Sequence, residues 1–246
     1  MKLSLTAELD AQGEWIAEDI PINIVYEDEH ILVVNKPAGL VVHPAAGHAS
    51  GTLLNALLHY YPNSITIPRA GIVHRLDKDT TGLMVVAKSL QAQTSLVEQM
   101  QRHSVSRVYE CIVNGVVIAG STVKAAIGRS PTQRQRMAVV DGGKMAVSHY
   151  RVLQRFRSHT HIRVLLETGR THQIRVHMQH EGFPLVGDIT YGGRYLKSFP
   201  RQALHARFLE LDHPVTGDRM RWESSLPDEM MELLDRLEED KDAFSE

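Results

Sequence analysis

The sequence has little cysteine and no long apolar run, and both absences limit the class of protein. Among its 246 residues only Cys111 is a cysteine. This excludes an internal disulfide and a zinc site built from several cysteines, and it is typical of a reducing compartment. No apolar stretch approaches the ~20 residues of a membrane span, and the early acidic residues argue against a signal peptide. We therefore expect a soluble protein of the cytoplasm.

Motifs for nucleotide cofactors and metals are also missing. The chain has no Gly-x-x-x-x-Gly-Lys loop and no Gly-x-Gly-x-x-Gly fingerprint. His172 and His177 are separated by five positions, so they do not share a helix face as a zinc-binding pair would. Cys111 lies in an apolar, alternating segment that is typical of a protein core. The sequence thus predicts neither a cofactor nor a metal.

The net charge of −2 does not by itself indicate a polyanionic partner, but the charge is unevenly distributed. Residues 227–246 hold nine acidic and two basic residues, so residues 1–226 carry a net charge of +5. Residues 102–175 hold thirteen basic and three acidic residues, a net charge of +10. A solvated polar surface is the ordinary explanation of a charged run. An excess of this size favours a polyanion such as a nucleic acid.

Apolar periodicity and turn residues predict an α+β protein. Strands are predicted over residues 31–35, 82–88, 105–117, 146–156, 162–167 and 203–211. Helices are predicted over residues 52–60, 90–102 and 172–180, and in the acidic segment after Pro227. Because most strands follow one another without helices between them, we expect a mixed, mostly antiparallel sheet with flanking helices.

The densest polar cluster is His74-Arg75-Leu76-Asp77-Lys78-Asp79-Thr80-Thr81-Gly82. Its acidic residues have the spacing of a calcium loop, but Lys88 stands where that loop needs a bidentate glutamate. Asp77 and Asp79 alternate in an extended segment and should face opposite ways, so they are not expected to share a proton. A single reactive carboxylate in a pocket needs a neighbouring cation to remain ionised. A surface loop with ion pairs would explain the same residues.

This cluster and several other segments, in this order along the chain, resemble the RluA-type pseudouridine synthases. The resemblance rests on Gly71-Ile72-Val73-His74-Arg75-Leu76-Asp77-Lys78-Asp79-Thr80-Thr81-Gly82-Leu83, together with Asn35-Lys36-Pro37-Ala38-Gly39, Arg107-Val108-Tyr109-Glu110, Gly169-Arg170-Thr171-His172-Gln173-Ile174-Arg175-Val176-His177, Leu185-Val186-Gly187-Asp188 and Leu204-His205-Ala206. It extends from about residue 20 to about residue 227. Residues 55–62 and 68–70 resemble the members that act on large-subunit ribosomal RNA.

The resemblance implies the pseudouridine-synthase fold with a central RNA-binding cleft, and the isomerisation of uridines, most of all in 23S ribosomal RNA. Asp77 would be the essential carboxylate, which either adds to C1′ of the ribose or removes a sugar proton. Arg175 would pair with this carboxylate. Tyr109 would stack on the uracil and assist proton loss at C5, although a strand tyrosine in the core is the alternative.

Chemistry at C1′ and C5 requires the nucleotide to leave the base stack. The resemblance implies that Arg75 takes the vacated place in the RNA, which suits a planar cation; an ion pair with Asp79 is the alternative. We expect Arg129, Arg134 and Arg136 to lie in a mobile loop that binds RNA phosphates, with surface solubility as the alternative. His43, His74 and His205 are expected to be structural.

Many relatives carry an N-terminal S4 RNA-binding domain, and we expect none here. Residues 1–19 are predicted to be a remnant or linker, and residues 20–246 a catalytic domain that ends in an acidic helix. The expected partner is large-subunit ribosomal RNA or the assembling large subunit. We expect the protein to be a monomer and not to bind a membrane. Two alternatives stay open: a non-catalytic RNA-binding or ribosome-assembly module of the same fold, and a glycosidase. The glycosidase would need a second carboxylate across the cleft from Asp77.

Overall fold

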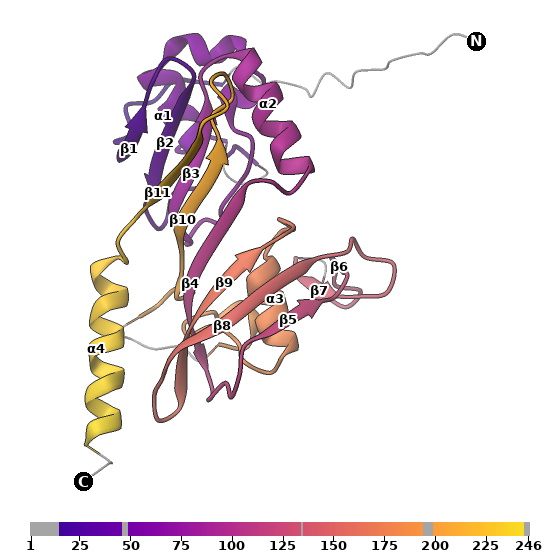
Figure 1. Ribbon diagram of the computed structural model, residues 1–246, viewed down its shortest axis with the longest axis vertical. Helices are drawn as coiled ribbons and strands as arrows, with labels where there is room; N and C mark the ends of the chain where they lie inside the picture. Colours follow the sequence, from indigo (N-terminus) through magenta and orange to yellow (C-terminus); the bar gives the residue numbers. More distant parts are fainter. Residues whose placement is uncertain (1–14, 46–48, 134, 194–198, 244–246) are drawn as a thin grey trace.

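The computed structural model describes residues 15–45, 49–133, 135–193 and 199–243. Within these ranges, nine strands form one sheet in the order β1-β2-β3-β10-β4-β9-β8-β5, with β11 beside β10 (Figure 1). The strands of this sheet are β1 Ile24–Glu27, β2 Ile31–Lys36, β3 Thr81–Ala87, β4 Ser106–Asn114, β5 Ser121–Lys124, β8 Val147–Arg155, β9 His159–Leu166, β10 Leu204–Asp212 and β11 Arg219–Glu223. A separate hairpin consists of β6 Ile127–Arg129 and β7 Met137–Val139.

The sheet is mixed and mostly antiparallel, as predicted. In the described part of the chain only β3 and β10 pair in parallel, and the other neighbours are antiparallel. One row of paired residues crosses the centre of the sheet: Lys36 on β2 pairs with Gly82, which pairs with Ala206, which pairs with Tyr109. This row brings four of the sequence motifs to one place.

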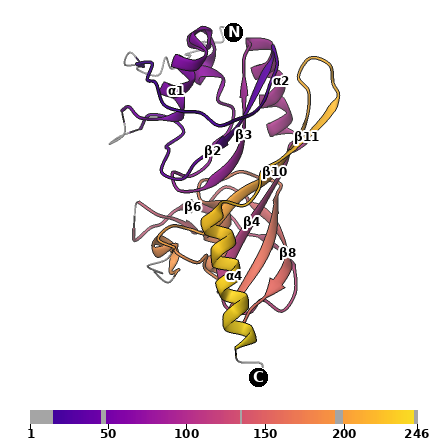
Figure 2. The same cartoon turned by 90° about the vertical axis from the view of Figure 1, so that its left-hand side faces the viewer.

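Helices cover both faces of the sheet (Figures 1 and 2). Apolar residues of α1 (Leu53–Tyr60) and α3 (Gln173–His180) belong to one core cluster with β3, β4 and β9. On the opposite face, α2 (Leu90–Gln101) packs over the β2–β3 end and α4 (Asp228–Asp242) packs over Ile112 of β4. Alternate residues of a strand point to opposite faces, so each central strand contributes to both layers.

Helix starts follow local hydrogen-bonding chemistry. The Thr52 and Asn55 side chains form a reciprocal capping box at the start of α1. At the start of α2 the Ser89 hydroxyl accepts a hydrogen bond from the Ala92 N–H at 3.1 Å. These side chains therefore fix the first residues of α1 and α2, close to the predicted starts.

One predicted strand and part of the predicted linker differ from the expectation. The predicted strand over residues 162–167 begins earlier, at His159, because His159 and Thr160 already pair with β4. Residues 15–19, predicted to be part of a linker, contact α1: the Asn55 side chain donates to the Ile16 carbonyl at 2.7 Å, and the Glu18 N–H donates to the Asn55 carbonyl at 3.0 Å. Residues 1–14 lie outside the described residues. None of the helices in the described ranges has the length and hydropathy needed to cross a membrane.

Candidate active site

The polar cluster lies between the short 3-10 helix η2 (Pro68–Gly71) and β3, at the point where β3 and β10 meet in parallel. Gly82 holds a φ of +114°, and a Cβ at this position would lie 2.3 Å from the Ala206 carbonyl oxygen. Only glycine permits this conformation and this close approach. The loop that precedes Gly82 is thereby fixed next to β10 and, one strand further, next to Tyr109 on β4.

A cleft of about 840 Å³ opens in front of this loop. Its lining includes residues from three segments that are far apart in the sequence, namely Arg75 and Asp77, Tyr109, and His172 and Arg175. Asp77 is the only carboxylate among the described residues that line the cleft. The glycosidase alternative, which needs a second carboxylate across the cleft, therefore has no support.

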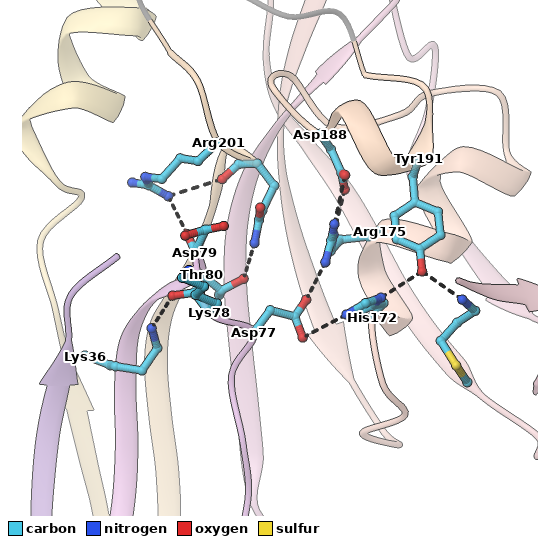
Figure 3. A network of polar contacts seen from close by, with 12 residues as sticks. Lys36, Asp77, Lys78, Asp79, Thr80, His172, Arg175, Asp188, Tyr191 and Arg201 are labelled. Atoms are coloured by element: carbon cyan, nitrogen blue, oxygen red, sulfur yellow. Dashed lines mark hydrogen bonds and ion pairs between the residues drawn. The ribbon is translucent and has the colours of Figure 1, made fainter. Parts of the chain in front are cut away.

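Asp79 is directed away from this cleft, as the alternation predicted. It does not line the cleft, and its carbonyl oxygen accepts a hydrogen bond from Arg201 Nη1 at 3.0 Å (Figure 3). Arg201 also forms an ion pair of 2.6 Å with Glu229 at the start of α4. The residues that follow Asp77 are thus anchored to the C-terminal helix.

Arg175 joins two carboxylates at the back of the cleft (Figure 3). Its Nη1 donates to Asp77 Oδ2 at 3.1 Å, while Nε and Nη2 donate to the two oxygens of Asp188 at 2.7 and 2.9 Å. Burial alone would lower the pKa of Arg175, but the hydrogen bonds and charges of Asp188 and Asp77 raise it above its ordinary value. The bidentate contact with Asp188 fixes the guanidinium plane, so Arg175 stabilises and orients the Asp77 carboxylate.

His172 approaches the other oxygen of Asp77. Its Nε2 lies 3.8 Å from Asp77 Oδ1, and its Nδ1 lies 2.7 Å from the hydroxyl of Tyr191, in the short 3-10 helix η3 (Ile189–Tyr191). Burial lowers the pKa of His172, the Asp77 charge opposes this, and the Arg175 charge adds to it. The imidazole is therefore neutral near pH 7.

Tyr109 lies in the cleft wall with only 6% of its surface exposed. Burial raises the pKa of its phenol, the Arg107 charge lowers it, and the Asp77 charge raises it. The phenol is consequently protonated near neutral pH. In the described part of the structure its hydroxyl has no hydrogen-bond partner, which leaves it available to a ligand.

The motif around Arg175 also contains residues that hold α3 in place. The Gln173 side chain donates through Nε2 to the Val147 carbonyl and to Ser148 Oγ, and its Oε1 accepts from the Thr168 hydroxyl at 2.7 Å. His177 contacts the same Ser148 hydroxyl at 2.9 Å. These contacts fix α3 against β8, so that Arg175 is presented from a rigid helix. No group of three His, Cys, Asp or Glu side chains in the described ranges is arranged to bind a metal ion.

Lys36 supports the loop from the opposite side. Its ammonium group is buried and donates to the carbonyls of Pro37, Leu40 and Lys78 at 2.7–2.9 Å. Burial lowers the pKa of Lys36 to about 8, against the opposing charges of Asp79 and Asp77. The Lys36 ammonium group thus joins the turn after β2 to the loop that carries Asp77.

Two of the histidines expected to be structural have buried partners. His74 Nε2 accepts the Val85 N–H at 3.0 Å, and burial, with the Arg107 charge, lowers its pKa to about 3. His205 Nδ1 lies 2.8 Å from the Thr81 hydroxyl, and burial lowers its pKa to about 4. Both side chains are neutral near pH 7 and fix the strands that border the cleft.

The arginines predicted to bind RNA fall into two groups. Arg75 is exposed at the cleft and forms no ion pair with Asp79 in the described part of the chain. Arg129 and Arg136 do not line the cleft. The prediction of a loop is wrong at Arg129, which ends β6 and pairs with Met137, because a hairpin forms here. The Ser130 N–H also donates to the Arg136 carbonyl at 2.8 Å. Arg134 lies outside the described residues.

Three side chains of this site were not singled out from the sequence: Asp188, His172 and Tyr191. In the sequence Asp188 belongs only to a segment that resembles the family, and His172 stands out only as a histidine without the spacing of a metal ligand. Asp188 follows Gly187, whose φ of +74° and whose close approach to the Arg201 carbonyl oxygen, 1.9 Å from where a Cβ would lie, are seen only in the folded chain. For Tyr191 we find no local signal.

Comparison with known proteins gives consistent results. The family model described as RNA pseudouridylate synthase matches residues 30–180. The chain is 66% identical over 256 residues to ribosomal large subunit pseudouridine synthase D of Pseudomonas aeruginosa, covering 99% of this chain and 80% of that protein. It is 53% identical over 252 residues to the protein of the same name of Escherichia coli, covering 97% and 77%.

Solved structures give a similar result. The human RNA pseudouridylate synthase domain containing 1 structure has a TM-score of 0.66 at 25% identity, covering 89% of this chain and 95% of that one. The structure of human RNA pseudouridylate synthase domain containing 4 has a TM-score of 0.68 at 24% identity, covering 88% of this chain and 93% of that one. The predicted fold class is confirmed by these similarities.

Proposed function

The chain belongs to the RNA pseudouridylate synthase family, and on this premise we propose that it isomerises uridines of large-subunit ribosomal RNA to pseudouridine. The resemblance stated from the sequence motifs is confirmed by the family match. The names of the relatives that align with almost the whole chain support a large-subunit ribosomal RNA substrate, and we propose 23S RNA.

The observation that carries the proposal is the Asp77–Arg175 pair at the cleft. In the reaction the bond between C1′ and N1 breaks, the uracil turns, and C5 bonds to C1′. A proton is lost from C5 and one is gained at N1, so that the product is an isomer. We propose Asp77 as the carboxylate that either adds to C1′ or removes a sugar proton. Arg175 binds Oδ2 and leaves Oδ1 without a hydrogen bond among the described residues.

Tyr109 and Arg75 have the positions that recognition of an unstacked uridine would need. A buried tyrosine ring beside the carboxylate offers a stacking surface for a uracil. Because burial keeps its phenol protonated, we propose that Tyr109 stacks on the base and that its hydroxyl donates a hydrogen bond. The exposed Arg75 guanidinium at the cleft is suited to the place that the nucleotide leaves.

We propose that the β6–β7 hairpin binds RNA phosphates through Arg129, Arg134 and Arg136. An Arg136→Ala variant is expected to weaken RNA binding for all sequences and to reduce the slope of log K against log salt by about 0.7–0.9. An unchanged slope would exclude a phosphate contact. We further propose that a single chain is the active unit, because one chain supplies Asp77, Tyr109 and Arg175 to the same cleft. The lone buried Cys111 is compatible with the reducing cytoplasm, where we place the reaction.

The test is to map pseudouridines in large-subunit ribosomal RNA by carbodiimide-dependent stops of reverse transcription. Cells with the gene, cells without it and cells with Asp77→Asn are compared. We expect specific stops with the gene that are missing in the other two. If the stops are the same in all three, the chain is a non-catalytic RNA-binding or ribosome-assembly module, the alternative that the intact Asp77–Arg175 pair disfavours.

A further inference from the structure

The histidine next to Asp77 has a left-handed backbone conformation, which is uncommon outside glycine. His172 lies at φ +57° and ψ +23°, in the left-handed region, directly before α3. This region is uncommon for any residue other than glycine, although asparagine, aspartate and histidine adopt it more often than other residues do. A strained residue at a site indicates that its side chain has a use there.

The strained backbone places the imidazole between Asp77 and Tyr191 (Figure 3). Nε2 lies 3.8 Å from Asp77 Oδ1, the oxygen that Arg175 does not bind, and Nδ1 lies 2.7 Å from the Tyr191 hydroxyl. The imidazole is partly buried, with 25% of the side chain exposed. Asp77 is therefore held by Arg175 at one oxygen and faced by His172 at the other.

The tautomer of His172 follows from the hydrogen bonds of Tyr191. The Tyr191 oxygen accepts the N–H of Met137, the first residue of β7, at 3.0 Å. Its single O–H has His172 Nδ1 as the only acceptor among the described residues. Nδ1 therefore accepts, and the proton of the neutral imidazole is on Nε2, where it points to Asp77.

We propose that His172 is a positioning residue for Asp77, and that the Tyr191 hydroxyl fixes its tautomer and orientation by joining it to strand β7. The inference rests on the proposed function, in which Asp77 is the catalytic carboxylate. The N–H of His172 directs the free carboxylate oxygen toward the ribose. Tyr191 acts through His172, and it links the carboxylate to the base of the hairpin that carries the proposed phosphate contacts.

Two substitutions separate the side chain of His172 from its strained backbone. His172→Gly removes the imidazole and relieves the strain, whereas His172→Asn tolerates the same backbone and keeps an N–H donor and an acceptor. For His172→Gly we expect kcat to fall by about tenfold to a hundredfold, because the contact of Nε2–H with Asp77 Oδ1, 3.8 Å long in the free protein, shortens to a hydrogen bond with a charged group when RNA is bound, while KM stays unchanged. His172→Asn is expected to recover part of this loss. A packing role alone would give the two variants equal rates.

Tyr191→Phe tests the second half of the proposal. It removes the hydroxyl but keeps the ring that lies 4.9 Å from the Arg175 guanidinium. We expect kcat to fall by about tenfold and the double variant His172→Gly/Tyr191→Phe to be no slower than His172→Gly. Tyr60→Phe is the matched control, because Tyr60 donates to Glu27 at an exposed position of α1, and its rate is expected to equal that of the wild type.

The experiment measures kcat and KM for pseudouridine formation in a large-subunit ribosomal RNA transcript, with a thermal unfolding curve for each variant. An inactive wild type would contradict the proposed function. An active wild type with inactive Asp77→Asn, but with full activity in His172→Gly and Tyr191→Phe, would overturn this inference alone. Additive losses in the double variant would show that Tyr191 does not act through His172. If Tyr191→Phe fails to fold, the comparison of His172→Gly with His172→Asn decides.

Discussion

Replacing Asp188 with asparagine tests whether this residue holds the guanidinium that orients Asp77. The Asp188 side chain is 1% exposed and receives two hydrogen bonds from Arg175, whose own side chain is 9% exposed. Asparagine removes the charge and turns one acceptor into a donor, so one guanidinium N–H faces an amide N–H. Breaking a buried ion pair costs about 3–5 kcal/mol. The remaining contact of Arg175 with Asp77 places the expected loss of stability near the lower value, about 3 kcal/mol.

The assay is chemical and thermal unfolding of Asp188→Asn, followed by a measurement of kcat. For a chain of this length, about 3 kcal/mol corresponds to a lower melting temperature by roughly 6–12 °C. The kcat is also expected to fall, because Arg175 loses its fixed plane. Asp218→Asn is the control, since Asp218 is exposed in a turn, and it should change stability by less than about 0.5 kcal/mol. If Asp188→Asn is as stable and as active as the wild type, Asp188 does not hold Arg175.

Three further predictions concern the surroundings of the site. Gly82→Ala places a Cβ 2.3 Å from the Ala206 carbonyl oxygen. Its free energy of unfolding, measured in urea, should be lower than that of the wild type by more than about 3 kcal/mol. For His205, burial lowers the pKa to about 4. Between pH 6.5 and 4 the unfolded chain binds a proton that the folded chain does not, so the free energy of unfolding falls as the pH falls. The fall should be larger by about 2–3 kcal/mol than in His205→Gln. Arg75→Ala should leave the melting temperature unchanged but lower the activity on structured RNA more than on unstructured RNA; equal losses on both would contradict its proposed place in the RNA.

The sequence predicted the elements that carry strong local patterns. Continuous apolar runs indicated β2 and β3, helical spacing indicated α2 and α4, and helical spacing together with a capping residue indicated α1. The strands β1, β5, β6, β7 and β11 were not predicted, because they have three to five residues each and carry little alternation. Their pairing depends on neighbouring strands rather than on their own composition.

The same division applies to the site. Asp77, Tyr109 and Arg175 stand in motifs that resemble a family, and the fold brings them to one cleft. Asp188 and Tyr191 act through contacts that local patterns do not encode: Asp188 meets Arg175 only because Gly187 lets the chain pass close to Arg201. The left-handed conformation of His172 is likewise imposed by the turn before α3 and is not visible in its neighbours.

Release of tritium from RNA labelled at C5 of uridine reports directly whether Asp77 is required for the isomerisation. Formation of the bond between C5 and C1′ expels the C5 hydrogen, so label enters water as pseudouridine forms. We expect release by the wild type and no release by folded Asp77→Asn. Asp79→Asn is the control and is expected to release tritium, because Asp79 does not line the cleft. Release by Asp77→Asn at the wild-type rate would show that Asp77 is not the catalytic carboxylate.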